Sequence, residues 1–107
     1  MMTKENDLRK LSESQIEARV FEQLRKFKGH NAPSDEEPPE VTRKTNLFKV
    51  KGGLGYDSLD LVEAIMELEE EFSVFITEDD SDRIRTAGDV VDAVKRSLPS
   101  NFFQNNI

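Results

Sequence analysis

Few residues of this 107-residue chain could do chemistry by themselves. There is no Cys, so no disulfide and no thiolate metal site can form, and any thiol chemistry requires a group added to the chain. The single His, His30, has no Cys or carboxylate pattern around it and is expected to be an exposed loop residue. Because the sequence has no nucleophile elbow, phosphate loop or His-containing triad, we do not expect an enzyme.

An acidic run near Asp80 raises the question of a metal site. An EF-hand loop needs a central Gly and a bidentate Glu at its end, and neither follows Asp80 and Asp82 at the required offset. Weak binding of divalent ions by a crowded acidic face stays open, but no specific metal site is expected.

Ser58 is the hydroxyl residue with the most informative surroundings. It follows glycines at positions 52, 53 and 55 and stands with Asp57 at the start of a predicted helix. A hydroxyl at a helix start lies outside the helical hydrogen-bond ladder, so an enzyme can reach it, and glycines let the preceding loop bend closely. Two alternatives stay open: Ser58 is a plain N-cap, or Asp57 is the cap with Asp60 at N3.

Capping signals and apolar spacing predict four helices and no strand. The first starts with Ser12 or Ser14 as its cap and ends near Gly29, and the second runs from Asp57 or Ser58 to about Phe72. A short third helix covers 78–83, and a fourth runs from 86 to 98, with a proline at 99 that discourages continuation. The fold class is therefore all-α, a four-helix bundle with three longer helices and one short helix.

The chain reads as one small domain with two tails. Residues 1–11 form the predicted N-terminal tail, 12–98 the domain and 99–107 the C-terminal tail, and within the domain 29–53 form a long loop. A loop of this length should be fixed to the core somewhere, and Phe48 or Val50 is the predicted anchor.

The second predicted helix carries two apolar stripes. The first faces the core and consists of Leu61, Ile65, Leu68 and Phe72. The second lies elsewhere on the helix and consists of Leu59, Val62 and Met66. It is surrounded by the acidic residues Glu63, Glu69 and Glu70. This second stripe either widens the buried face or forms a docking surface for a partner.

Charge distribution favours docking. The chain has a net charge of −7, but residues 57–92 contain thirteen acids against two Arg, a local net of −11. Such a segment repels nucleic acid and anionic lipid and attracts basic partner surfaces, although acids can also simply solvate helix faces.

The polar N-terminus predicts no signal peptide, and no apolar run approaches the ~18 residues of a membrane span. We expect a cytoplasmic monomer.

The run from Leu54 to Asp60, Leu-Gly-Tyr-Asp-Ser-Leu-Asp, resembles the attachment motif of acyl carrier proteins. Glu69 to Phe72, Ile76 to Asp80 and Ile84 to Thr86 follow in that family's order. The resemblance is strong over 54–98, looser over the first helix, and scarcely covers 29–53 and 99–107.

The resemblance implies an acyl-carrier-like four-helix bundle in which Ser58 is the modified serine, flanked by Asp57 and Leu59. A phosphopantetheinyl transferase, with Mg²⁺ serving that enzyme, would attach 4'-phosphopantetheine from coenzyme A to the Ser58 hydroxyl. The arm's thiol would then carry acyl groups as thioesters. The positive end of a helix dipole tolerates a phosphodiester at this place. The resemblance also implies that acyl-transferring and acyl-modifying enzymes with basic patches dock on the second stripe.

Three positions depart from the family pattern. Gly53 stands where the family usually has an acid, Thr77 replaces a common proline, and Glu67 occupies an often small position. These departures suggest a specialised carrier of a dedicated lipid, lipopolysaccharide or polyketide pathway. Two alternatives are an acidic helical adaptor that carries no arm, and a peptidyl or aryl carrier.

Overall fold

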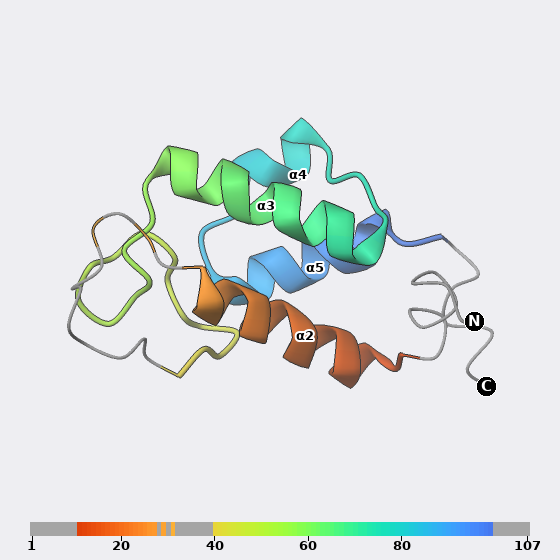
Figure 1. Ribbon diagram of the computed structural model, residues 1–107, viewed down its shortest axis with the longest axis horizontal. Helices are drawn as coiled ribbons and strands as arrows, with labels where there is room; N and C mark the ends of the chain where they lie inside the picture. The colour runs from red at the N-terminus through yellow and green to blue at the C-terminus, as the bar shows by residue number, and fades with distance from the viewer. Residues whose placement is uncertain (1–10, 28, 30, 32–39, 100–107) are drawn as a thin grey trace.

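The computed structural model describes residues 11–27, 29, 31 and 40–99. It contains four helices, labelled as in Figure 1: α2 (Glu13–Lys26), α3 (Ser58–Phe72), α4 (Glu78–Asp82) and α5 (Ala87–Ser97). Within these described residues the only β pairing is an isolated antiparallel bridge between Asn46 and Thr86. The predicted all-α fold with three longer helices and one short helix is confirmed. The predictions for His30 and for most of both tails concern residues outside those that the structure describes.

Each of the three longer helices begins with a capping box. In this motif the cap side chain accepts a hydrogen bond from the N3 backbone, and the N3 side chain accepts one from the cap backbone. The three pairs are Ser12 with Gln15, Asp57 with Asp60, and Thr86 with Asp89. Of the alternatives left open by the sequence, the structure therefore selects Ser12 over Ser14 and Asp57 over Ser58.

The core lies between α2, α3 and α5. In Figure 1, α2 runs opposite to α3 and α5, and each of these helices contacts the other two. Their buried apolar side chains recur at helical spacing, as the sequence predicted for α2 and α3. The larger of them are Ile16, Val20 and Leu24 of α2, Leu61, Ile65, Leu68 and Phe72 of α3, and Val90, Val91 and Val94 of α5.

The loop between α2 and α3 is anchored by Leu47, not by Val50. Leu47 is 0% exposed, and it links two distant segments because its N–H donates to Arg85 O and its carbonyl accepts from Tyr56 N–H. Phe48 is partly buried against the core. Val50 is 50% exposed, so its predicted anchoring role is wrong. Leu47 and Val50 are both apolar, and the hydrogen bond of Leu47 with Arg85 distinguishes the buried residue from the exposed one.

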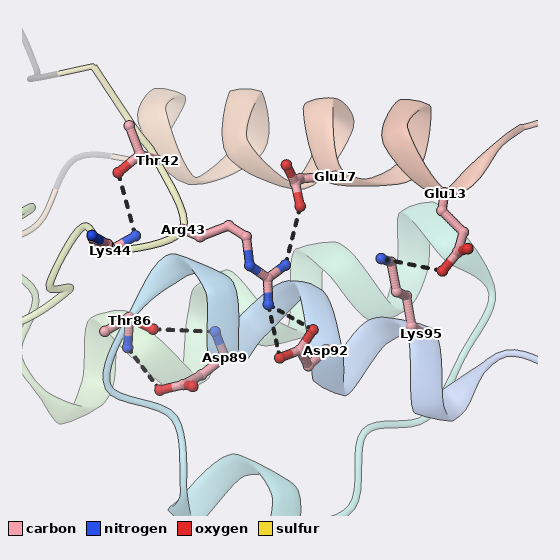
Figure 2. Close-up of polar contacts among 9 residues, drawn as sticks. All are labelled: Glu13, Glu17, Thr42, Arg43, Lys44, Thr86, Asp89, Asp92 and Lys95. Atoms are coloured by element: carbon pink, nitrogen blue, oxygen red, sulfur yellow. Dashed lines mark hydrogen bonds and ion pairs between the residues drawn. The ribbon is translucent and has the colours of Figure 1, made fainter.

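Arg43 links the same loop to helices α2 and α5. Its guanidinium donates to Glu17 of α2 at 3.0 Å and to Asp92 of α5 at 2.9 Å, as Figure 2 shows. Its backbone carbonyl accepts a hydrogen bond from Gly88 N–H. This part of the loop is thereby held against both α2 and α5.

Candidate functional site

Ser58 is the first residue of α3, and its side chain is not needed for capping. Asp60 N–H donates to Asp57 Oδ1 at 2.8 Å, and Asp57 N–H donates to Asp60 Oδ2 at 3.0 Å. The reading of Ser58 as a plain N-cap is therefore wrong. Ser58 is exposed, and no hydrogen bond ties its hydroxyl to the described part of the chain. The hydroxyl is free to react with a group brought from outside.

The turn that leads to Ser58 is rigid. Gly55 has a φ of 69°, in the left-handed region that favours glycine, and its N–H donates to Lys49 O at 3.0 Å. Tyr56 is buried, and its hydroxyl donates to Leu24 O of α2 at 2.7 Å. Burial, helped by the negative charge of Asp60, raises the pKa of Tyr56, so the phenol stays protonated as a donor. The start of α3 is thereby fixed relative to the end of α2.

The residues at this place fit an attached phosphodiester. Ser58 lies at the positive end of the α3 dipole, where anions are stabilised. Because the hydroxyl is exposed, a phosphate joined to it need not enter the core or displace a buried side chain. The site therefore supplies a reachable oxygen and a fixed backbone at the N-terminal end of α3.

The second apolar stripe of α3 is exposed. Leu59 is 58% exposed, Val62 50% and Met66 61%, and Glu63 and Glu70 beside them are exposed as well. The alternative that these residues widen the buried face is wrong, because none of the described helices covers them. We call Leu59, Val62, Glu63, Met66 and Glu70 the α3 face. A shallow hollow next to it is lined by Phe27, Glu63, Met66, Glu67 and Glu70.

The sequence singled out Ser58, Asp57, Leu59 and the α3 face, and the structure brings all of them onto α3 or its cap. It also assigns a structural role to two residues that sequence reasoning did not choose. Tyr56 and Leu47 anchor the turn before Ser58 in the core, and both are almost fully buried. The signal for Tyr56 was an aromatic residue directly before the Asp-Ser pair, whereas Leu47 lay in a loop without periodicity.

The acidic run of α4 serves ordinary structural contacts. Thr77 caps this short helix by accepting from Asp80 N–H, and the Asp80 carboxylate pairs with Arg96 of α5 at 3.1 Å. Among the residues that the structure describes, no three His, Asp or Glu side chains lie close enough to hold a metal ion. In the same residues no helix is long and apolar enough to cross a bilayer.

Each of the three departures from the family pattern has a local structural role. A Cβ on Gly53 would lie 2.4 Å from Lys49 O and 2.5 Å from Asn46 O, so the acid usual in the family does not fit this loop. Thr77 caps α4, as proline could not with its side chain. Glu67 accepts a hydrogen bond from Gln23 Nε2 at 3.0 Å and so joins α3 to α2.

Comparisons with known proteins agree with this geometry. Residues 37–94 match the protein family described as "Phosphopantetheine attachment site". The chain is 44% identical over 61 residues to an acyl carrier protein of Amoebophilus asiaticus. The matched region covers 57% of this chain and 72% of that relative. The chain is also 40% identical over 62 residues to the acyl carrier protein of two strains of Porphyromonas gingivalis, covering 58% of this chain and 76% of each relative. Ser58 and the whole α3 face lie inside the matched residues.

Proposed function

Because this chain belongs to the acyl carrier protein family, we propose that Ser58 is the residue that carries the 4'-phosphopantetheine arm. The observation that carries this proposal is the exposed hydroxyl of Ser58 at the first position of α3, left without a capping role by Asp57. When bound, the arm supplies a thiol that holds acyl groups as thioesters. The chain itself supplies none, because it has no Cys. We propose that the domain spans residues 12–98 and catalyses no reaction by itself.

Attachment requires little chemistry from the carrier. The Ser58 oxygen forms a new bond to the phosphorus next to the pantetheine of coenzyme A. The bond from that phosphorus to the bridging oxygen of the pyrophosphate breaks, and adenosine 3',5'-bisphosphate leaves. The proton of the hydroxyl passes to a base of the transferase. The carrier's residues keep the oxygen exposed, fix the turn through Tyr56, and favour the phosphodiester through the α3 dipole.

The α3 face supports the proposal that partner enzymes dock beside the arm. Its apolar centre of Leu59, Val62 and Met66 is edged by Glu63 and Glu70, an arrangement that suits an apolar contact ringed by basic residues. We propose the phosphopantetheinyl transferase and the acyl-transferring or acyl-modifying enzymes as these partners. The cytoplasmic location and the monomeric state remain predictions from the sequence.

The departures at Gly53, Thr77 and Glu67 support a specialised carrier in a lipid, lipopolysaccharide or polyketide pathway. Identification of the thioester on protein purified from its native cell tests this, and an aminoacyl or aryl thioester would indicate a peptidyl or aryl carrier instead. Complete fatty-acid synthesis with this carrier alone, in a reconstituted system, would contradict specialisation.

The attachment is tested by intact mass after co-expression with a broad-specificity phosphopantetheinyl transferase. We expect an increment of one phosphopantetheine in the wild type and in Ser14→Ala, and none in Ser58→Ala. Ser14 is a suitable control because it is an exposed serine at the start of another helix. If the wild type gains no mass while a known carrier in the same cells does, the chain is an acidic helical adaptor without an arm.

A further inference from the structure

A positively charged loop tip lies at the same end of the molecule as Ser58, and neither the capping nor the α3 face uses it. We call Lys49, Val50 and Lys51 the basic tip. Both lysines are exposed, and Val50 between them is half exposed. The tip is next to the serine turn because Lys49 O accepts the hydrogen bond from Gly55 N–H. In Figure 1 this loop and the start of α3 lie at the same end of the molecule.

The basic tip is held in shape by the backbone around it. Asn46 Oδ1 accepts hydrogen bonds from Phe48 N–H at 2.8 Å and Lys49 N–H at 2.9 Å. Asn46 O accepts another from Leu54 N–H at 3.1 Å. Gly53 packs directly against the carbonyls of Asn46 and Lys49, where no larger residue fits. A loop fixed in this way loses little backbone entropy when it binds a partner.

The lysines of the basic tip form no ion pair with the part of the chain that the structure describes. The chain has 22 acidic residues against 15 basic ones, yet within residues 11–27, 29, 31 and 40–99 neither Lys49 nor Lys51 forms an ion pair. Arg43, Lys95 and Arg96, by contrast, pair with carboxylates of neighbouring helices. The two lysines and the exposed Val50 therefore remain available to an acidic surface with a small apolar contact.

We propose that the basic tip docks on an acidic surface of the phosphopantetheinyl transferase that modifies Ser58, while the α3 face docks on a basic surface of the same enzyme. This inference rests on the proposed function. We favour the transferase over acyl-handling enzymes as the partner because it must come closer to Ser58. Enzymes that act on the end of a long arm can stay distant from the serine, whereas the serine oxygen is one bond from Cβ. The transferase must therefore approach the backbone around Ser58. The basic tip is hydrogen-bonded to the preceding turn at Gly55 and lies at the same end of the molecule, so it lies in the area that such an enzyme would face.

The test uses steady-state transfer kinetics with the apo carrier, coenzyme A and the phosphopantetheinyl transferase encoded in the same genome. Lys49→Glu with Lys51→Glu should lower kcat/KM by about ten-fold or more through KM, because like charges would then oppose each other across the interface. The kcat at saturating carrier should stay unchanged, since Ser58 and its turn are intact. Val50→Ser should raise KM several-fold without changing the salt dependence.

Arg25→Glu with Lys44→Glu is the matched control, because it makes the same change of charge at two other exposed residues. The control should stay within about two-fold of wild type if position matters more than net charge. Reversal of an acidic patch on the transferase should restore the rate of the Lys49→Glu, Lys51→Glu carrier. Thermal melting of every variant verifies that the fold is kept.

The outcomes separate this inference from the proposed function. If the wild type accepts the arm and the Lys49→Glu, Lys51→Glu variant has the same kcat/KM as the control, the basic tip does not dock and the carrier function stands. If the wild type accepts no arm from any active transferase, the proposed function itself fails. If sedimentation shows a wild-type dimer that the double reversal converts to a monomer, a second copy of the chain occupies the tip and the inference is overturned.

Discussion

Arg43 of the loop forms an ion pair with Asp92 of α5. Arg43 Nη2 donates to both Asp92 Oδ1 and Asp92 Oδ2, each at 2.9 Å, while its other terminal nitrogen reaches Glu17 at 3.0 Å (Figure 2). One loop side chain thus connects α2 and α5, which are separated in sequence by the whole α3–α4 segment. The loop cannot leave the bundle without breaking this contact and the hydrogen bond between Gly88 N–H and Arg43 O.

Arg43→Gln should lower the melting temperature by a few degrees, and the difference should shrink in 1 M salt. The ion pairs are partly exposed, so salt screens them, whereas the backbone hydrogen bond to Gly88 is kept. Thermal melts at low and high salt measure this. Lys44→Gln, an exposed neighbour without an ion pair to the described residues, should melt like wild type. Equal melting of the two variants would show that Arg43 does not stabilise the loop.

Asp89 makes the start of α5 sensitive to acid. Burial by itself raises the pKa of Asp89, but hydrogen bonds from the backbone N–H groups of Arg85 and Thr86 outweigh it, and the pKa lies below the ordinary value of 3.8. A lowered pKa in the folded state contributes stability that is fully present above 3.8 and is lost as the pH falls through the lower folded value.

Asp89→Asn should therefore be less stable than wild type at pH 7, and the difference should narrow as the pH falls below 3.8. Urea unfolding of both proteins between pH 7 and strongly acidic pH measures it. A difference in the free energy of unfolding that does not change with pH would mean that Asp89 acts only by its shape.

Gly53→Asp restores the acid that the family usually has at this position, and it should destabilise this chain by about 1–3 kcal/mol. The new Cβ would lie 2.4 Å from Lys49 O, so the loop must shift to admit it. Gly52→Asn is the control: Gly52 has a φ of 79°, which Asn tolerates better than most residues, and no atom lies within 4 Å of the new Cβ. The free energies of unfolding in urea compare the two. If Gly53→Asp costs no more than Gly52→Asn, the close packing of the loop is not what excludes an acid.

Substitutions on the α3 face should separate docking from stability. Met66→Ser and Glu63→Lys change exposed side chains, so both should melt close to wild type. Leu68→Ala removes a fully buried side chain of the same helix and should cost about 2–5 kcal/mol. Binding of the holo carrier to the acyl-loading enzyme of the same genome should weaken by about ten-fold for Glu63→Lys and become less dependent on salt. Unchanged affinity in both surface variants would rule out the α3 face as the docking surface.

The sequence by itself determined the helices because capping and periodicity are local signals, and it singled out Ser58 through the resemblance of residues 54–60 to a known attachment motif. Capping boxes involve residues three apart, and the buried stripes of α2 and α3 follow the helical period, so neither needs a distant contact to be recognised. The same capping box leaves the Ser58 hydroxyl unused. Two readings of Ser58 were open from the sequence, because Asp and Ser are both good caps, and the geometry decided between them.

Only the tertiary structure decided what depends on contacts between distant segments. Leu47 is buried and Val50 exposed because Leu47 pairs with Arg85, a partner thirty-eight positions away that no local pattern indicates. Leu59, Val62 and Met66 remain exposed because no described helix packs over that side of α3. Tyr56 positions the serine turn only because Leu24 O happens to lie within reach of its hydroxyl. Local sequence can state the type of each side chain, whereas the packing of the bundle determines which of them face a partner.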